Sequence, residues 1–293
     1  MAPEALKQHH ALCERTGAEA CLVIYKGKIV QEIYSARYRE PMTAMSSTKS
    51  VTGLLVGMLM DAGKIKSIDE PICTYLREWC AGTKGKVTIQ HLLTMTSGLP
   101  DLHGAPQGVG YQADKNPYVI GLPLVDEPGT KWAYSNEGVQ LLSPILDMAA
   151  GESIQDYARK HLFEPLGMLK TRLKLDEKGH AWTYGDMETT PRDFARLGLL
   201  MLNKGVWDGR RIVSAEWVER STSRSQEHNP DYGLLWWLYH SPEGYAALGY
   251  LNTNLYMFPG QELIIVRMQN RPINQQYSYE QGALRLFRRM SRK

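Results

Sequence analysis

Strand-forming runs occur at both ends of this 293-residue sequence, and the stretch between them is punctuated as helix and loop. Residues 20–25 and 28–34 are rich in β-branched and aromatic side chains and meet at Lys26-Gly27, which predicts a hairpin. Near the carboxyl end, similar runs separated by Gly, Pro and Asn cover residues 232–239, 245–250, 254–258 and 263–269. Because a sheet needs several strands and a covered face, we expect both ends to build one antiparallel sheet together.

Sequence patterns typical of helices occur before, between and after these predicted strands. Amphipathic patterns predict a helix over residues 4–16 and a last helix over 274–290. In between, capping residues predict helix starts at five positions: Thr88, Asn136, Ser153, Thr190 and Ser214. The predicted class is therefore α/β of the α+β type, an antiparallel sheet flanked by terminal helices with an all-helical subdomain inserted. We expect residues 1–45 and 228–293 to form the α/β part and residues 46–227 the mostly helical part of one structural unit.

Composition narrows the class of partner. The formal net charge is only +3 and most positive residues are scattered, which argues against nucleic-acid binding. No apolar run approaches the ~18 residues of a membrane span, so no membrane association is expected. The amino end lacks the profile of a signal peptide, which favours a cytoplasmic protein, or an exported one whose signal segment has been removed. Oligomeric state is left open.

The cysteines and histidines do not have the spacing of a metal site, and we expect neither metal nor cofactor. Four cysteines are present, of which Cys73 and Cys80 could face each other across two helical turns. Buried free thiols are the preferred interpretation. We interpret His9, His91 and His103 as surface or core histidines.

The stretch from Met45 to Leu55 passes from small residues directly into an apolar helix. Ser46 and Lys49 are three positions apart, so at a helix start their side chains share one face. A hydroxyl and an amine placed in this way can act as nucleophile and base. The simpler alternative makes Ser46 a helix cap and Lys49 a solvated residue, since Ser-x-x-Lys arises by chance roughly once in such a chain.

A second stretch, from Glu127 to Asn136, contains a Pro-Gly turn followed by Tyr134-Ser135-Asn136 directly before a predicted helix. Tyr134 and Asn136 are two apart and can project from a loop to the same side. The alternative is a packed tyrosine followed by an Asn cap. Because Tyr-x-Asn recurs at residues 250–252, this tripeptide alone predicts little.

Together these stretches resemble the serine β-lactamase-like, penicillin-recognising hydrolases, which combine Ser-x-x-Lys, Tyr-x-Asn and a third motif on a strand. The resemblance covers residues from about 40 to 270, and is closest to the esterase–amidase branch that includes family VIII carboxylesterases and 6-aminohexanoate-dimer hydrolase. It is carried in order by residues 46–50, 89–99, 127–130, 134–136, 164–168 and 190–196. It implies the β-lactamase/transpeptidase-like fold, in agreement with the split architecture predicted above.

The resemblance also implies roles for individual residues. Ser46 matches the acylated nucleophile, and Lys49 matches the amine that accepts or relays its proton. Tyr134 matches the tyrosine that protonates the leaving group and helps to deprotonate the serine. Asn136 matches the amide that orients Lys49 and the substrate. Whether Lys49 or Tyr134 is the acylation base is left open.

The third motif departs from that of the β-lactamases. Where those enzymes carry Lys-Thr-Gly or His-x-Gly, this chain has Ala247-Leu248-Gly249-Tyr250. Gly249 keeps the strand approachable, and the N–H of Tyr250 is expected to join that of Ser46 as an oxyanion hole. On the preceding strand, Trp236 or Trp237 is expected to line the substrate pocket, within an aromatic wall of Tyr232, Trp236, Trp237, Tyr239 and Tyr250.

The third motif of this chain lacks the Lys or His of the β-lactamases, and this difference bears on which substrates the protein binds. β-Lactams and acyl-D-Ala-D-Ala peptides present a carboxylate, which a Lys or His in this motif usually helps to bind. We therefore expect a serine hydrolase that cleaves small esters or amides through an acyl-enzyme on Ser46. The alternatives are a β-lactamase or D-alanyl-D-alanine carboxypeptidase-like peptidase, and a non-catalytic penicillin-binding-type module.

Overall fold

Six antiparallel strands form one sheet in the computed structural model, which describes residues 3–273 and 278–290. The spatial order is β2-β1-β10-β9-β8-β7, so β1 from the amino end pairs with β10 from the carboxyl end, with Leu22 opposite Val266. The two chain ends therefore build one sheet, as predicted. The strands are β1 (Ala20–Tyr25), β2 (Lys28–Tyr34), β7 (Trp237–His240), β8 (Glu243–Ala247), β9 (Asn254–Phe258) and β10 (Leu263–Met268).

Two predicted strands are shorter than their sequence patterns suggested. The strand predicted from Tyr232 begins only at Trp237, because Leu235 has a left-handed backbone (φ 63°) that interrupts the extended run. The strand predicted to reach Tyr250 ends at Ala247. Beyond it, Tyr250–Asn252 form a 3-10 turn in which Leu251 and Asn252 have positive φ.

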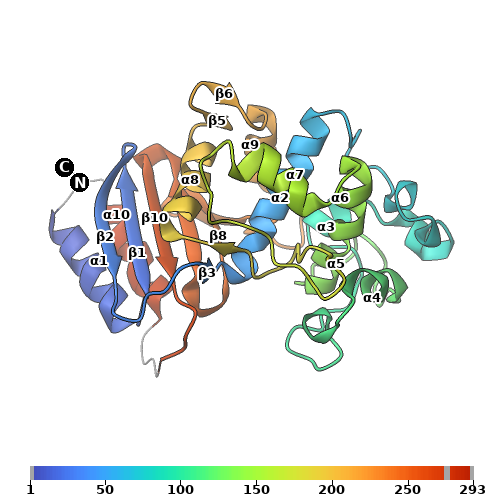
Figure 1. Cartoon of the computed structure of the whole chain (residues 1–293), viewed down its shortest axis with the longest axis horizontal. Coiled ribbons are helices and arrows are strands. Elements are labelled where there is room, and N and C mark those ends of the chain that lie inside the picture. The colour runs from blue at the N-terminus through green and yellow to red at the C-terminus, as the bar shows by residue number, and fades with distance from the viewer. Residues whose placement is uncertain (1–2, 274–277, 291–293) are drawn as a thin grey trace.

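Helices α1 (Pro3–Arg15) and α10 (Tyr279–Met290) cover the outer face of the sheet (Figure 1). The alternation of β1 explains this, since Cys21 and Val23 pack with these helices while Leu22 and Ile24 belong to the core on the other face. The first four residues of the predicted last helix, 274–277, lie outside the described residues.

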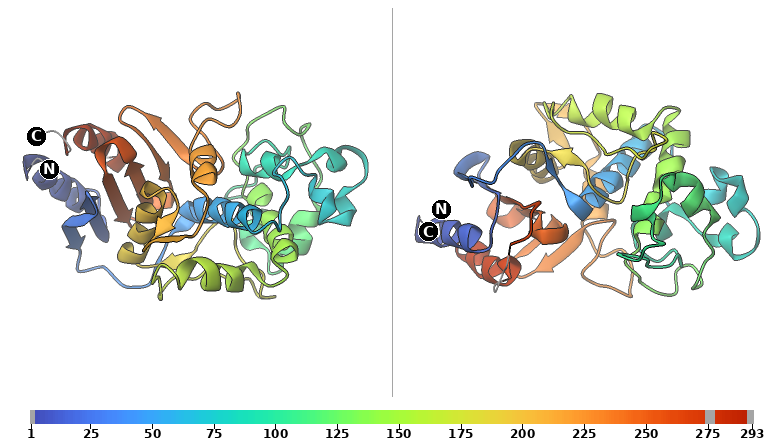
Figure 2. Two further views of the ribbon diagram at one scale, coloured as in Figure 1. Left: turned by 90° about the horizontal axis from the view of Figure 1, so that it is seen from above. Right: turned by 60° about the horizontal axis from the view of Figure 1, so that its bottom comes forward.

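The inner face packs against α8 (Pro191–Leu202), and α2 (Thr48–Asp61) lies between the sheet and the remaining helices (Figures 1 and 2). Gly198 of α8 permits close approach, because a Cβ there would lie 2.9 Å from Cγ2 of Ile264 in β10. The division at residues 45 and 228 stays a prediction, and α8 from the predicted helical part contacts the sheet directly.

The other end of the molecule is helical, with short strand pairs at its borders (Figure 2). Thr88, Ser153, Thr190 and Ser214 accept the predicted capping hydrogen bonds, whereas Ser135 replaces Asn136 as the cap of α5. The helices are α3 (Ile89–Leu93), α4 (Lys115–Gly121), α5 (Asn136–Gln140), α6 (Leu142–Ala150), α7 (Ile154–Ala158) and α9 (Ala215–Ser221). The short strands are β3 (Met42–Thr43), β4 (Glu188–Thr189), β5 (Val206–Trp207) and β6 (Arg210–Arg211). None of the described helices is long and apolar enough to cross a membrane.

The cysteines form two disulfides, so the interpretation as free thiols was wrong. Cys13 of α1 is bonded to Cys21 of β1, and Cys73 is bonded to Cys80. The first pair joins a helix to the strand beneath it, a contact between elements that sequence spacing alone does not reveal.

His9 lies fully buried between α1 and the sheet. Its Nδ1 donates to Oε1 of Gln31 (2.6 Å), and its Nε2 accepts from the hydroxyl of Tyr279 (2.7 Å). Burial lowers the pKa of His9 from 6.5 to about 4, with further lowering by Arg267 and His10. The neutral imidazole is therefore the form that the folded protein holds.

We expect His9 to make folding stability fall with acidification. The unfolded chain binds a proton at His9 near pH 6.5 and the folded chain only near pH 4. This contribution is therefore fully present above pH 6.5 and is lost toward pH 4, by about 3 kcal/mol in all. In denaturant unfolding at pH 7, 5.5 and 4.5, H9Q should depend less steeply on pH than wild type. H161Q, which changes an exposed histidine far along the chain, should keep the wild-type slope; equal slopes in all three proteins would contradict this assignment.

Candidate active site

Ser46 occupies a single 3-10 turn, Met45–Ser47, that leads into α2, so it precedes the helix by two residues rather than opening it. Met45 has a left-handed backbone (φ 51°), an uncommon state for a side-chain-bearing residue. Two bonds to its carbonyl hold it there, from the N–H of Asp186 (3.1 Å) and the hydroxyl of Thr48 (2.7 Å). These two bonds fix the backbone of the turn that carries Ser46.

The hydroxyl residues around Ser46 join this turn to three other segments. Ser47 donates to the carbonyl of Thr253, and Ser50 donates to that of Leu235, each at 2.6 Å. Thr52 donates to the carbonyl of Thr183, also at 2.6 Å. The small-residue run of the sequence thus anchors α2 against the segments that follow β8, precede β7 and precede β4.

Lys49 lies one turn after Ser46 and is only 2% exposed. Its Nζ is 3.1 Å from Oγ of Ser46 and donates to the carbonyl of Tyr184 at 2.6 Å. Among the described residues, no carboxylate forms an ion pair with this amine. The alternative of a solvated Lys49 is therefore wrong, and a hydroxyl and a buried amine are in hydrogen-bond contact.

Tyr134 stands beside Lys49, whose Nζ is 4.8 Å from the centre of the tyrosine ring. Ser135 holds the loop that carries Tyr134. Its hydroxyl accepts a hydrogen bond from the N–H of Gly138, which caps α5, and donates one to the carbonyl of Pro100 (2.9 Å). The ring stacks on Trp237 at 6.2 Å between centroids. The structure therefore brings Ser46, Lys49, Tyr134 and Trp237 together at one place.

Asn136 lies next to this group but does not contact Lys49 by a hydrogen bond among the described residues. Instead its Nδ2 donates to Nδ1 of His103 at 2.9 Å, and its Oδ1 is buried without a partner. The expected orienting bond to Lys49 is thus replaced by one to His103, which we interpreted from the sequence only as a surface or core histidine.

Gly249 lies against the segment that precedes Ser46. A Cβ on Gly249 would be 2.8 Å from the carbonyl oxygen of Ala44 and 3.0 Å from Cβ of Met45. Only glycine fits this contact without displacement of the backbone. Tyr250 begins the turn that follows and is 69% exposed.

The buried side chain of Arg267 binds the backbone of the turn that begins at Tyr250. Arg267 of β10 donates to the carbonyls of Leu251 (2.6 Å) and Asn252 (3.0 Å), and Asn254 accepts from the N–H of Gly249 (3.0 Å). Burial lowers the pKa of Arg267 to about 10. Because these bonds satisfy carbonyls in an irregular turn, Arg267 fixes the backbone that carries Tyr250.

The structure separates the two tryptophans offered as pocket residues. Trp237 is half-buried beside Tyr134, whereas Trp236 is buried in the core and lines a small internal cavity with Val51, Leu54 and Phe194. The proposed aromatic wall is correspondingly smaller than expected. Tyr232 is fully buried behind Trp237, and Tyr239 faces α10, where its hydroxyl donates to Glu280.

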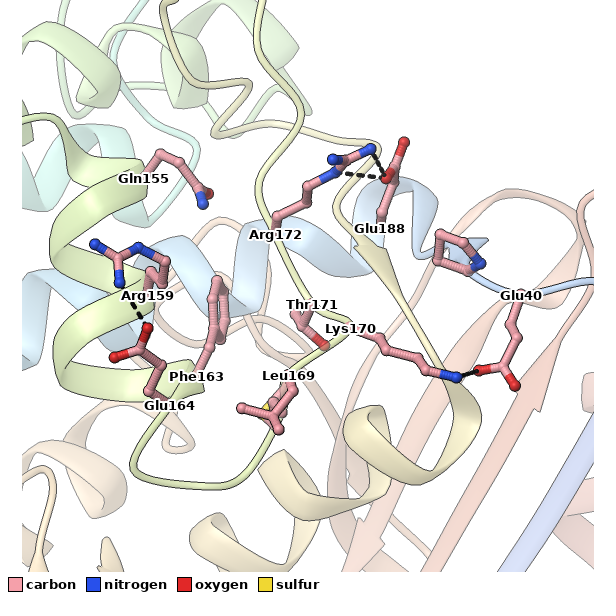
Figure 3. A pocket seen from close by; sticks show the side chains of 12 residues that line it. Glu40, Gln155, Arg159, Phe163, Glu164, Leu169, Lys170, Thr171, Arg172 and Glu188 are labelled. Atoms are coloured by element: carbon pink, nitrogen blue, oxygen red, sulfur yellow. Dashed lines mark hydrogen bonds and ion pairs between the residues drawn. The ribbon is translucent and has the colours of Figure 1, made fainter.

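A cavity of about 550 Å³ lies elsewhere, between α7 with the turn after it and the β3–β4 region (Figure 3). Each of its cations points to a carboxylate: Arg159 to Glu164, Lys170 to Glu40 and Arg172 to Glu188. None of Ser46, Lys49 and Tyr134 lines it. The cavity is therefore separate from the serine–lysine pair, and its three cations are each paired with a carboxylate.

Comparison with known proteins agrees with this geometry. The Beta-lactamase family model matches residues 8–287. The 6-aminohexanoate-dimer hydrolase of Paenarthrobacter ureafaciens is 25% identical over 291 residues, covering 88% of this chain and 74% of that protein. A Bacillus anthracis structure, provisionally classed as a 6-aminohexanoate-dimer hydrolase, superposes with a TM-score of 0.84 at 22% identity over 96% of this chain and 81% of its own. A family VIII carboxylesterase structure gives 0.76 at 16% identity over 98% of both chains.

The β-lactamase/transpeptidase-like fold and the serine–lysine pair define the class of serine hydrolases. Within that class the chain belongs to the Beta-lactamase family.

We expect Gly249→Ala to push the strand end away from the serine turn. The crowded Cβ should destabilise the protein by about 1–3 kcal/mol, and displacement of an oxyanion donor should lower ester hydrolysis by about tenfold or more. Gly260→Ala is the matched control, because nothing lies within 4 Å of its Cβ position. Thermal unfolding and p-nitrophenyl acetate hydrolysis measure both effects. A G249A protein as active and stable as G260A would show that the contact does not position the site.

Proposed function

We propose that this protein cleaves small esters or amides through an acyl-enzyme on Ser46. The observation that carries the proposal is the contact between Oγ of Ser46 and the buried amine of Lys49. A serine hydroxyl is a poor nucleophile until a base removes its proton, and an amine can do so only in its neutral form. At 3.1 Å, Nζ of Lys49 lies within direct proton-transfer reach of Oγ of Ser46.

In acylation, Oγ of Ser46 attacks the substrate carbonyl while its proton passes to Lys49 or Tyr134. The carbonyl oxygen becomes an anion, which the N–H groups of Ser46 and Tyr250 stabilise as an oxyanion hole. The carbon–leaving-group bond then breaks and the leaving group receives the proton, with Tyr134 as its donor. Water attacks the acyl-enzyme by the same route in reverse and restores Ser46.

The substrate class follows from the chemistry around the serine. The position of the third motif holds Leu248-Gly249, with no cation for a substrate carboxylate. Trp132, Tyr134 and Trp237 form an aromatic group beside Lys49. The name of the Paenarthrobacter relative describes the hydrolysis of a 6-aminohexanoate dimer. These observations favour neutral esters or amides over β-lactams and cell-wall peptides.

We propose an oxidising compartment for the protein, the exported alternative of the sequence prediction. Disulfides persist in such compartments and are rare in the cytosol, and the chain has two. We also propose a small-molecule partner, with neither nucleic acid nor membrane involved. Thiol titration of the denatured, unreduced protein should find no free cysteine; four free thiols in protein purified from its native compartment would contradict this location.

We expect Ser46→Ala to lower kcat for p-nitrophenyl acetate by at least about 10⁴-fold, because the nucleophile is removed while Lys49 keeps its bond to the carbonyl of Tyr184. Ser223→Ala, which changes an exposed hydroxyl, controls for the loss of a serine elsewhere. Circular dichroism checks that both variants are folded. Turnover by S46A equal to that of S223A would remove Ser46 from the mechanism.

The same assay separates esterase from β-lactamase. We expect turnover of p-nitrophenyl esters and no turnover of nitrocefin, since the site lacks the cation that binds the β-lactam carboxylate. Nitrocefin hydrolysis at a rate comparable to ester hydrolysis would support the β-lactamase alternative. A lasting nitrocefin adduct without turnover of either substrate would support the penicillin-binding module.

A further inference from the structure

Two aspartates and a histidine meet at the amino end of α4, which lies at the helical end of the molecule (Figure 1). They are Asp114, directly before α4, and Asp176 and His180, in the hairpin closed by the bridge between Leu175 and Ala181. Each offers one ligand atom, and these atoms all lie within 4.8 Å of one another. Nδ1 of His180 is 3.2 Å from Oδ1 of Asp114 and 3.3 Å from Oδ2 of Asp176.

Asp114 does not act as a helix cap. It occupies the N-cap position of α4, where an aspartate commonly accepts a backbone N–H, but its side chain makes no capping hydrogen bond. Asp176 instead accepts the first N–H of the helix, that of Lys115, at 2.9 Å. Oδ1 of Asp114 is shielded from solvent and has no hydrogen-bond partner, although Nδ1 of His180 is close to it. Such an oxygen is costly, which indicates that a further group completes its bonding.

A single proton does not satisfy this arrangement. Nδ1 of His180 carries at most one hydrogen, and two carboxylate oxygens lie at nearly equal distances from it. A metal ion in the place of that hydrogen bonds to all three groups, with the ring proton on Nε2. Two ligand atoms that bind a tetrahedral zinc ion at about 2.1 Å are themselves about 3.4 Å apart, which is close to both distances.

The donor set indicates a transition-metal dication. Imidazole nitrogen and carboxylate oxygen together suit Zn²⁺, whereas Mg²⁺ and Ca²⁺ prefer oxygen ligands. The two carboxylates balance the charge of the ion, and among the described residues no lysine or arginine is ion-paired with either of them. The nearby cations, Lys115 and Lys174, lie over the ring of Trp182 instead, at 4.1 and 3.8 Å from its centre.

The surroundings hold Asp176 in a fixed orientation. Its side chain is only 1% exposed, and its Oδ1 accepts the N–H groups of Lys178 (2.9 Å) and His180 (2.8 Å). Hydrogen bonds of this kind orient the carboxylate ligands of metal ions. The side chains of Asp114 and His180 are 39% and 31% exposed, so an ion reaches them from solvent.

We propose that Asp114, Asp176 and His180 bind one Zn²⁺ ion, with water completing its coordination. The ion joins the segment before α4 to the hairpin that leads to Tyr184, whose carbonyl binds Nζ of Lys49. The site does not depend on the proposed hydrolysis at Ser46. Sequence spacing did not predict it, because Asp114 is far from the other two ligands along the chain.

Zinc binding to the intact, metal-free protein tests the site, by competition with a chromophoric chelator. Wild type should bind one zinc ion per chain. Asp114→Asn and His180→Gln should each weaken this binding by at least about tenfold, since each removes a ligand with little change of shape. His240→Gln is the matched control, because its histidine is exposed and faces one carboxylate, that of Asp231, at 2.9 Å. Circular dichroism checks folding, and equal binding by all four proteins would overturn the site.

A second measurement needs no variant. Zn²⁺ at about one hundred times its Kd should raise the midpoint of thermal unfolding of wild type by about 5 °C, because the ion binds the folded chain. Mg²⁺ at the same concentration should give no comparable shift, since the site contains an imidazole ligand. No shift with zinc would overturn the proposal, and an equal shift with magnesium would overturn its choice of metal.

Discussion

The buried amine of Lys49 is the constraint around which the site is built. It is removed from water, has no carboxylate partner among the described residues, and is held by Oγ of Ser46 and the carbonyl of Tyr184. An amine in such a place is costly unless its hydrogen bonds are satisfied, so the segments that supply them must be fixed. The hydroxyls of Ser47, Ser50 and Thr52 do this by bonding α2 to three separate backbone segments. Packing and chemistry therefore depend on the same few contacts.

The sheet contributes the opposite wall of the site. Because β1 and β10 pair across the chain ends, the strand end at Ala247 is brought against the turn that carries Ser46. Gly249 makes that approach possible, and Arg267 holds the irregular turn after it. The third-motif position on this wall is occupied by Leu248-Gly249, which offers no cation to a substrate carboxylate.

Much of the fold could be predicted from the sequence, because it depends on local signals. The 20–25 and 28–34 hairpin, the caps at Thr88 and Thr190 and the antiparallel sheet follow from residue patterns of short range. Local errors shifted a strand start at Leu235 and a helix cap at Asn136 by a few residues, whereas the failures within the site involve long-range geometry. The side on which Trp236 packs, the partner of Asn136 and the pairing of Cys13 with Cys21 depend on segments far apart in the chain. Tyr184 enters the site through its backbone carbonyl, so its side-chain identity gave no signal. His103 was interpreted only as a surface or core histidine, because its sequence neighbourhood does not predict a contact with Asn136.

The central claim is that Ser46 forms a covalent acyl intermediate. Rapid acid quench during turnover of p-nitrophenyl acetate, followed by intact-mass and peptide mass spectrometry, tests it most directly. We predict one added acetyl group on the peptide that contains Ser46, formed at the rate of the p-nitrophenolate burst and absent from S46A. Turnover without any adduct, or an adduct on another residue that forms at the burst rate, would contradict it.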